Sequence, residues 1–427
     1  MSGYRASIFV MSCVIMSGLH SNAWSNPNQI NSGDWALHIP FDLEPTEALG
    51  ARALGMGNAF VGIADDATAA VVNPAGLAQI VGIDFTANYR YSFYEKEYLD
   101  TYAAVNNVGI GPELEEIRVF DNDMSRFSFV GLTIPVIPGQ LVTSLYYKNT
   151  SFEAADTQSA GPVTVLGNVQ QQNISTKNID TYQKDVYGVA AALNYSKSFS
   201  IGAAINMETL DTDLSEEWST TNFIDYDFDS MDSYDSQIQG DDSDVTFNIG
   251  VLIKPVDRLS IGVSYRTGSS FSIGYTSTET TCEPFSACNQ TQVNDYVSFD
   301  VPDILSSGVA WETFGGWRFS VQMDIVEYSV LQDSTTEDIT MDETIEDGII
   351  YRFGVEKSFY ESSALLYQLR AGMFTVPDHD GFQAIDSDSV YYTFGGGVTL
   401  SEQFKLNVGI SFSEDMVDNM LSLSYTF

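Results

Sequence analysis

The sequence predicts an all-β protein, namely a 14-stranded antiparallel transmembrane β-barrel with an N-terminal hatch, or plug, inside its lumen. Three observations support this fold class. Apolar and polar residues alternate with a period of two over most of the chain after Gly82. The connections between these segments are short and long in turn, which is typical of outer-membrane barrels. The chain ends in alternating apolar residues and a terminal aromatic, from Leu421 to Phe427.

Residues 1–23 predict a secretory signal peptide. Arg5 precedes an apolar run from Ile8 to Met16, and small residues end at Ala23. Cleavage after Ala23 or after Ser25 fits this pattern. No later stretch approaches about 18 uninterrupted apolar residues, so a membrane-embedded mature chain would cross the bilayer with strands.

Residues 24–80 are predicted to form the hatch. Their central stretch, Gly50–Ile80, resembles neither a strand nor a polar loop, because it is rich in small residues and has glycine turns at Gly55 and Gly57. The alternative is an ordinary N-terminal helix pair of a soluble domain. Asp65 and Asp66 break the stretch and are interpreted as helix N-caps.

The stretch ends in a turn at Asn73-Pro74-Ala75-Gly76. Pro74 fixes its own φ and biases Asn73 away from the helical region. We expect the Asn73 side chain to bond to nearby backbone.

Residues 81–427 are predicted to form the barrel. Most of its predicted strands have about the 9–11 residues that a tilted strand needs to cross the hydrocarbon. An even number of strands lets both chain ends lie on one side of the membrane. The predicted strands are 82–94, 126–135, 139–152, 183–196, 198–211, 243–254, 258–274, 295–312, 316–330, 348–358, 364–374, 389–400, 404–413 and 419–427.

The predicted connections alternate in length. Short turns, expected to be periplasmic, fall at 135–139, 196–198, 254–258, 312–316, 358–364 and 400–404. Long outer loops are predicted at 95–125, 153–182, 212–242, 275–294, 331–347 and 375–388, with a shorter one at 414–418.

Single strands separate into two faces. Between Trp317 and Ile325 the odd-numbered residues are apolar and the even-numbered ones polar, and a similar alternation runs from Ile349 to Glu356. Apolar residues facing lipid and polar residues facing the lumen explain this pattern, although a soluble sheet with one wet face gives it too.

A net charge of −40 excludes nucleic acid as a partner. The chain has 23 Tyr and 26 Phe, too many for a disordered acidic protein.

Acidic residues gather in the predicted outer loops, with thirteen acids and no Lys or Arg from Glu208 to Asp244. Asp225, Asp227 and Asp229 suggest calcium but lack the EF-hand glycine and glutamate, so a solvated surface is the default. Divalent ions that bridge the loops to lipopolysaccharide, and adaptation to a saline habitat, are the alternatives.

Cys282 and Cys288 are the only cysteines after the signal peptide. Their spacing in an exported protein predicts a small loop disulfide, and a metal site is the weaker interpretation because no histidine lies nearby. The mature chain has only His38 and His379, with no G-x-S-x-G motif, so we do not expect an enzyme. No cofactor or metal is expected.

Four arginines fall on the predicted lumen face. One interpretation is that one or two of them hold the carboxylate of a ligand. The favoured alternative is that they pair with the lumen acids Asp324 and Glu356, or with Asp65, Asp66, Glu44 and Glu47 of the hatch. These arginines are Arg266, Arg318, Arg352 and Arg370.

Two stretches resemble the FadL/TodX family of outer-membrane transporters for long-chain fatty acids and other hydrophobic compounds. Gly50–Ala78 contains the family's NPA motif as Asn73-Pro74-Ala75. Val301–Ser329 is similar to a family strand-turn-strand of the form P…GVAW…W.FS…D…YS, and weaker similarity covers Phe374–Thr399. The Gly50–Ala78 motif also resembles PorV-like barrels that serve type 9 protein secretion.

The resemblance implies passive uptake of a hydrophobic compound across the outer membrane of a Gram-negative bacterium. The ligand would be captured by the outer loops, gated by a hatch that includes Asn73 to Gly76, and released sideways through the wall. The alternative function is a PorV-like or structural barrel without solute transport. Tyr425 and Phe427 resemble the signal that barrels present to the barrel-assembly machinery. Other expected partners are outer-membrane lipid and lipopolysaccharide.

Overall fold

A computed structural model describes ten stretches of the chain: 49–99, 117–165, 170–224, 227–282, 287–332, 347–362, 365–377, 389–401, 403–413 and 416–427. The predicted signal peptide, the hatch acids Glu44 and Glu47, both mature histidines and Asp225 lie outside these residues. Among the described residues, no helix is both long enough and apolar enough to cross a bilayer.

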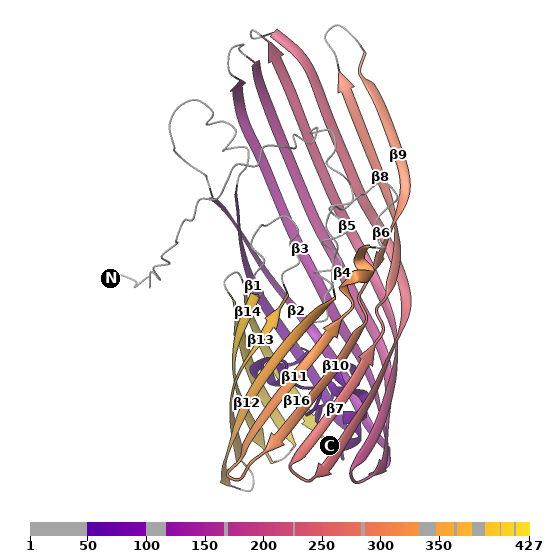
Figure 1. Cartoon of the computed structure of the whole chain (residues 1–427), viewed down its shortest axis with the longest axis vertical. Helices are drawn as coiled ribbons and strands as arrows, with labels where there is room; N and C mark the ends of the chain where they lie inside the picture. Colours follow the sequence, from indigo (N-terminus) through magenta and orange to yellow (C-terminus); the bar gives the residue numbers. More distant parts are fainter. Residues whose placement is uncertain are drawn as a thin grey trace, which may run out of the picture.

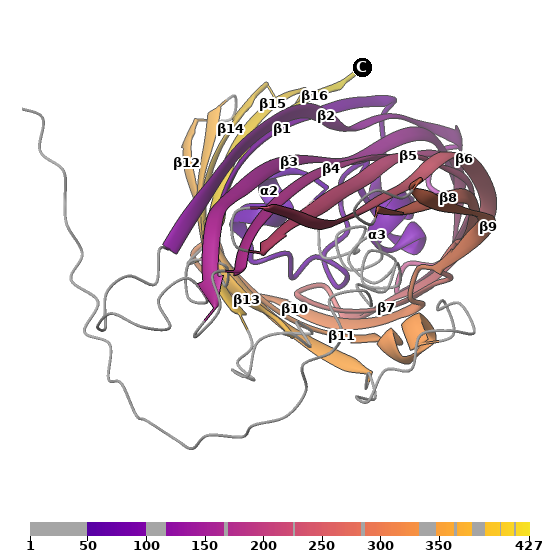
Figure 2. The ribbon, with the colours of Figure 1, turned by 90° about the horizontal axis from the view of Figure 1, so that it is seen from above.

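Antiparallel strands form a closed ring (Figures 1 and 2). The ring closes where the first strand pairs with the last, through pairs such as Phe85 with Tyr425. The strands are β1 Asp84–Leu99, β2 Ile117–Ile137, β3 Leu141–Val165, β4 Gln170–Ser196, β5 Phe199–Ile224, β6 Asp227–Val256, β7 Leu259–Arg266, β8 Ser270–Cys282, β9 Asn289–Asp300, β10 Ile304–Glu312, β11 Trp317–Val326, β12 Gly348–Ser362, β13 Leu365–Val376, β14 Ser389–Leu400, β15 Phe404–Phe412 and β16 Met416–Thr426.

These sixteen segments occupy fourteen positions in the ring, which confirms the predicted barrel. One part of β6 pairs with β7 and another part pairs with β8, so β7 and β8 continue a single strand. In the same way β10 pairs with β7 while β9 pairs with β8. The predicted strands 258–274 and 295–312 are therefore each interrupted once. Pro302 lies in the second interruption and has no N–H for the ladder.

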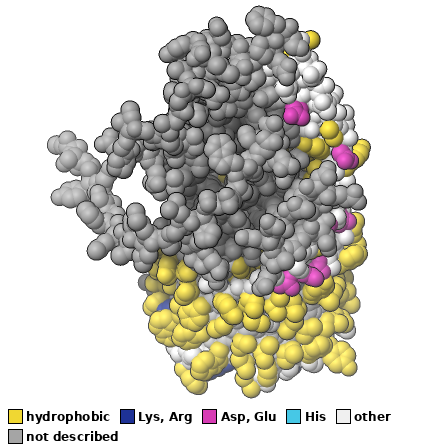
Figure 3. Space-filling view, turned by 45° about the horizontal axis from the view of Figure 1, so that its top comes forward, with side chains coloured by type: hydrophobic (Ala, Val, Ile, Leu, Met, Phe, Trp, Pro, Cys, Tyr) yellow, Lys and Arg dark blue, Asp and Glu magenta, His cyan; other side chains and the backbone are white. Residues whose placement is uncertain are grey.

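The predicted separation of faces is confirmed. In β11 the odd-numbered residues from Trp317 to Ile325 are exposed, whereas Ser320, Gln322 and Asp324 are buried inside the barrel. Figure 3 shows exposed apolar side chains covering the lower part of the molecule as a broad belt. Such a belt is what a lipid-facing surface requires.

Three predicted long loops are wrong over much of their length. Segments 153–182, 212–242 and 275–294 are largely strand, as are the described ends of segment 95–125, namely 95–99 and 117–125. Strands β3–β6, β8 and β9 extend well beyond the ends of β10–β16 (Figure 1). Their polar sequences no longer alternate because these parts lie beyond the apolar belt. The backbone hydrogen bonds between neighbouring strands stabilise these extensions, and neither face of them has to be apolar because neither contacts lipid. The predicted strand 316–330 also ends early, at Val326, and a 3₁₀ helix, η2 Tyr328–Gln332, follows.

Residues 49–80, called the inner segment below, lie inside the ring (Figure 2). They contain two short helices, α2 Ala51–Gly55 and α3 Ala69–Val72, and a 3₁₀ helix, η1 Pro74–Gln79. The segment contacts strands on both sides of the lumen, because α2 packs on β13–β16 and η1 packs on β3–β6. Nearly all its residues from Leu49 to Ala78 are buried.

Candidate functional site

Glycines of the barrel wall allow the inner segment to lie directly against the strands. A Cβ added at Gly354 would lie 2.2 Å from the Met56 carbonyl oxygen, and one at Gly262 would lie 2.1 Å from the Val61 carbonyl oxygen. Only glycine permits such an approach of two backbones. The wall glycines whose added Cβ would come within 2.5 Å of the inner segment form the glycine belt: Gly202, Gly250, Gly262, Gly354, Gly372 and Gly409.

The turn at Asn73–Gly76 joins the inner segment to this belt. The Asn73 side chain accepts a hydrogen bond from the Ala75 N–H at 3.2 Å, so the predicted bond from Asn73 to local backbone is confirmed. Its Nδ2 also donates to the carbonyl oxygens of Val61, at 3.0 Å, and of Val251 in β6, at 3.1 Å. Asn73 is fully buried. The turn therefore connects two parts of the inner segment to the wall.

A cluster of charges holds the α2 end of the inner segment. Glu356 of β12 accepts hydrogen bonds from Arg52 Nε at 3.1 Å and from Arg370 Nε at 2.7 Å. Asp65 pairs with Arg52 and, at 3.2 Å, with Arg318 Nη1. Arg318 and Arg370 are thus neutralised by carboxylates of the inner segment and the wall, and Arg352 by Asp324, so the favoured prediction of pairing is confirmed for three of the four lumen arginines.

The two neighbouring acids of the inner segment differ in charge environment. Burial raises the pKa of the Asp65 carboxyl, but Arg52 and Arg318 outweigh that effect and hold its pKa below the ordinary value. Burial raises the pKa of Asp66, whose Oδ1 accepts from the Thr68 N–H at 3.0 Å. The residue directly before α3 is Thr68, so the N-cap interpretation is wrong for Asp65, whereas Asp66 caps the turn that leads into α3 by accepting the Thr68 and Ala69 N–H groups. Asp65 is instead an ion-pair partner.

Arg352 has a different role from the other arginines. Its Nε donates to Asp324 Oδ2 at 2.5 Å, and Gln322 Nε2 donates to the other oxygen of Asp324 at 2.7 Å. Gln322 Oε1 accepts the N–H groups of Phe60 and Val61, at 2.8 and 2.9 Å, so this row of side chains also reaches the inner segment. Arg352 is 5% exposed, and its Nη1 has no hydrogen-bond partner in the structure.

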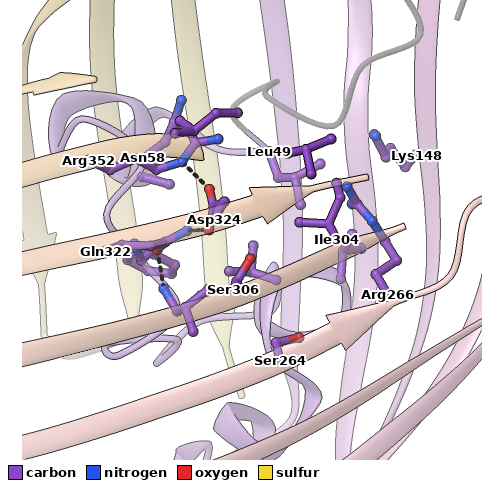
Figure 4. Close-up of a pocket in the computed structure, with 17 residues that line it drawn as sticks. Leu49, Asn58, Lys148, Ser264, Arg266, Ile304, Ser306, Gln322, Asp324 and Arg352 are labelled. Atoms are coloured by element: carbon purple, nitrogen blue, oxygen red, sulfur yellow. Dashed lines mark hydrogen bonds and ion pairs between the residues drawn. The ribbon is translucent and has the colours of Figure 1, made fainter. Parts of the chain in front are cut away.

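A pocket lies between the inner segment and the strands around β7 and β10–β12 (Figure 4). In Figure 4, Arg266 and Lys148 lie on one side of this pocket, and Arg352, Asp324 and Gln322 lie on the other. Within the described part of the chain, Arg266 forms no hydrogen bond and no direct ion pair with a carboxylate, although Glu208 and Asp324, each already paired with another cation, are near enough to interact with its charge. The apolar residues that line this pocket are Leu49, Ala53, Phe60, Val61, Val71, Val72, Ile304, Val326 and Ile350.

A second, more polar cavity shares Val71, Lys148 and Arg266 with this pocket. The ion pair between Lys184 Nζ and Glu208 Oε2, 2.5 Å long, lies in its wall. Lys184 is thereby neutralised. Arg266 is left facing the shared region of the two cavities.

The wall divides beside this region. The last pair between β2 and β3 is Phe129 with Lys148. Beyond it, each strand remains paired only with its other neighbour: β2 with β1 as far as Ile117 and Leu99, and β3 with β4 as far as Val165. The β1–β2 register skips Ser128, which is therefore bulged out of the ladder. A bulge bends its strand, and this one lies one residue from the last β2–β3 pair. We call this point the fork.

Two aromatic side chains lie inside the barrel at the fork. Phe129 is fully buried and stacks on Tyr146, with 6.0 Å between ring centroids. The Tyr146 ring occupies the space beside Gly188 of β4. Lys148, two residues after Tyr146, lines both cavities. The fork and the pocket are therefore contiguous.

Several residues of this site escaped the sequence analysis. Arg52, Lys148, Lys184 and Glu208 are as buried and charged as the predicted arginines. Lys148 and Lys184 lie at positions of β3 and β4 whose side chains face the lumen, so the alternation of the two strands could have predicted that they point inward. Arg52 had no such signal, because the inner segment has no strand periodicity.

Cys282 and Cys288 are joined by a disulfide at the end of the β8–β9 hairpin, as the sequence predicts.

The two C-terminal aromatic residues contact each other. Tyr425 lies in β16, and its ring packs edge to face on the Phe427 ring with 4.8 Å between the centroids. The Phe427 side chain is 71% exposed.

Comparison with known proteins identifies related barrels. The family model described as outer membrane protein transport protein (OMPP1/FadL/TodX) matches residues 178–418. A solved Pseudomonas aeruginosa FadL homologue superposes with a TM-score of 0.60 at 14% identity, over 88% of this chain and 98% of that chain. The P. putida toluene transporter TodX gives 0.57 at 14% identity, with the same two coverages. The Ralstonia pickettii toluene transporter TbuX gives 0.55 at 12%, over 90% and 99%. No curated protein sequence is significantly similar to the chain.

Proposed function

This chain belongs to the outer membrane protein transport protein family (OMPP1/FadL/TodX), and from that premise we propose that it is a passive uptake channel for hydrophobic compounds, with long-chain fatty acids as the substrate class. As an outer-membrane barrel, it has its long strands on the extracellular side and its short turns in the periplasm. No catalytic step is part of this function.

One observation carries the proposal: the pocket between the inner segment and the wall is apolar over much of its lining and has basic side chains with unused hydrogen-bond donors at its edges. Each CH₂ of an acyl chain gains about 0.8 kcal/mol on leaving water, so an apolar lining favours a long chain. Arg266 has no carboxylate partner among the described residues, and Arg352 Nη1 has an unmet donor. Either suits a ligand carboxylate, because charge-assisted hydrogen bonds are the strong ones.

The fork between β2 and β3 is our candidate for lateral release. It adjoins the pocket at Lys148 and lies at the edge of the apolar belt, where Phe127 is 59% exposed. Phe129 and Tyr146 stack on one another inside the barrel at the fork, and Tyr146 lines the second cavity. A ligand that passes them reaches lipid without crossing water, which is the favourable route for an acyl chain.

The inner segment acts in this proposal as the hatch. Its contacts with the glycine belt close the lumen toward the periplasm, and the turn at Asn73–Gly76 is its gating part. A Pro74→Leu change, or deletion of Asn73–Gly76, is expected to alter uptake while the barrel still assembles. Loss of assembly instead assigns the turn to folding.

Uptake by cells tests the substrate class. Cells with and without the protein are given a labelled long-chain fatty acid or a labelled alkane. We expect the protein to raise both rates, and Arg266→Gln to lower fatty-acid uptake but not alkane uptake. Lys197→Gln, at an exposed periplasmic turn, is the matched control. If removing the protein leaves uptake unchanged but blocks export of a surface protein, the secretion alternative is correct.

The release route is tested by a pair of substitutions on β2. Phe129→Ala removes a fully buried ring at the fork, whereas Phe127→Ala removes an outward-facing ring two residues away. We expect only the first to change the uptake rate in variants present at equal surface levels. Equal effects of the two substitutions contradict release at the fork.

A further inference from the structure

Two basic side chains on the outside of the barrel meet at one periplasmic turn. Most described basic side chains lie in the lumen, as the ion pairs of Arg52, Arg318 and Arg370 show. Arg258 and Lys357 instead lie at the turn between β10 and β11, residues 313–316. They come from neighbouring parts of the ring, since β7 pairs with β10 and β11 pairs with β12.

Arg258 lies over the ring of Phe314, with its guanidinium carbon 3.7 Å from the ring centroid. Phe314 is 83% exposed, so this stack is on the molecular surface. The Glu312 N–H donates to the Arg258 carbonyl oxygen at 2.8 Å and joins the two turns. Among the described residues no carboxylate forms an ion pair with Arg258. A stacked guanidinium keeps its edge N–H groups available.

Lys357 approaches the same turn from β12. It is the cross-strand partner of Trp317, and its Nζ lies 5.2 Å from the Trp317 ring and 5.3 Å from the Phe359 ring. The ammonium also donates to the Gly315 carbonyl oxygen. No described carboxylate pairs with it. One hydrogen bond leaves two of its three donors unused.

The surroundings place both cations at the membrane–water boundary. Exposed aromatic side chains gather there, which is typical of the aromatic belt at headgroup level. The short turns are periplasmic, so this boundary belongs to the inner leaflet of the outer membrane. The aromatic residues, with their exposed fractions, are Trp311 56%, Phe314 83%, Trp317 44%, Phe359 46% and Tyr360 76%.

We propose that Arg258, Phe314, Trp317 and Lys357 form a binding site for the phosphate of a phospholipid headgroup in the periplasmic leaflet. The guanidinium and the ammonium bind the phosphate oxygens, and the exposed rings contact the glycerol and the start of the acyl chains. In a chain with a net charge of −40, this pair of unneutralised cations is a local exception on the lipid-facing surface. The site is independent of the transport function.

Lipid retention by the purified protein tests the site. The full barrel in a neutral detergent is titrated with phosphatidylglycerol, or with a diacylglycerol of the same chains that lacks the phosphate, and bound lipid is counted by native mass spectrometry. We expect wild type to retain phosphatidylglycerol preferentially. We expect Arg258→Gln combined with Lys357→Gln to weaken that binding about tenfold, since two charge-assisted hydrogen bonds are lost.

Two controls keep the outcome decisive. Lys197→Gln removes an exposed lysine from another periplasmic turn and is expected to leave binding unchanged. Phe314→Ala keeps both charges but removes the ring under Arg258, and we expect an intermediate loss. Unchanged mobility on unheated gels shows that each variant is folded.

The proposal is overturned by equal retention of the two lipids, by unchanged binding in the double variant, or by an equal loss in Lys197→Gln. Inorganic phosphate alone serves as a further probe. If inorganic phosphate displaces the lipid from wild type and from the double variant at the same concentration, Arg258 and Lys357 do not form a lipid site.

Discussion

Replacing Gly354 by alanine is the most direct test of the contact between wall and inner segment. The added Cβ would lie 2.2 Å from the Met56 carbonyl oxygen, 2.8 Å from its carbonyl carbon and 3.0 Å from its Cα. These are backbone atoms, which cannot rotate away as a side chain can. Ordinary contact begins at 3.4 Å, so the inner segment must withdraw by about 1 Å or the strand must bend.

Overpacking of this kind costs about 1–3 kcal/mol. Gly354 lies in regular strand β12, where alanine itself is tolerated, so we expect the barrel to form. The inner segment is then held less tightly, and ions leak past it. The assay is ion conductance of the purified protein in planar bilayers, beside gel mobility of unheated samples as the measure of folding.

Gly396→Ala is the matched control, since it adds a methyl group to β14 where the nearest atoms, Val408 Cγ2 and Gln368 O, lie at 3.7 and 3.9 Å. Wild type and this control should conduct equally, and Gly354→Ala more. A folded Gly354→Ala protein with wild-type conductance would refute the reasoning, as would an equal rise in the control.

Three further predictions concern the charges and the C-terminus. Glu356→Gln leaves Arg52 and Arg370 without their shared carboxylate, and we expect about 3–5 kcal/mol less stability, measured by urea unfolding in detergent. Because the folded-state pKa of Asp65 is lowered, its ion pairs stabilise the fold at neutral pH, and the contribution disappears as pH falls from the ordinary aspartate range through the lowered pKa. Thermal unfolding against pH should lose this acid-side dependence in Asp65→Asn, and an unchanged profile would contradict it. Removing Phe427 should reduce the amount of barrel inserted in cells, and normal surface levels would count against the assembly-signal hypothesis.

The strands within the apolar belt were predictable from the sequence for a simple reason. A lipid-facing strand must alternate, so the two faces of β11 and β12 could be assigned from residue type alone. The extensions of β3 to β6 beyond the belt were predicted as loops, because pairing there depends on backbone and leaves no periodic mark. The fork at Ser128 and Phe129 was likewise invisible, since a bulge needs only one extra residue.

The candidate site was predictable in part. The alternation of lipid-facing and lumen-facing residues along each strand was enough to predict that four arginines point into the lumen, namely Arg266, Arg318, Arg352 and Arg370. Which of these arginines pairs and which does not could not be read from the sequence, because that depends on which carboxylates the folded barrel brings within reach. Arg370 pairs with Glu356, which is its cross-strand neighbour, whereas another partner of Glu356, Arg52, is 304 positions away in the chain.

The sequence by itself determined that this chain forms a barrel of fourteen strand positions, which residues face lipid, and that the turn at Asn73 bonds to its own backbone. These are local properties, set by a period of two and by turn chemistry. Only the tertiary structure decided which strands the inner segment contacts, which glycines make room for it, and which arginine is left without an ion pair beside an apolar pocket. Those properties arise when strands far apart in sequence close into a ring and their inward side chains share one enclosed space.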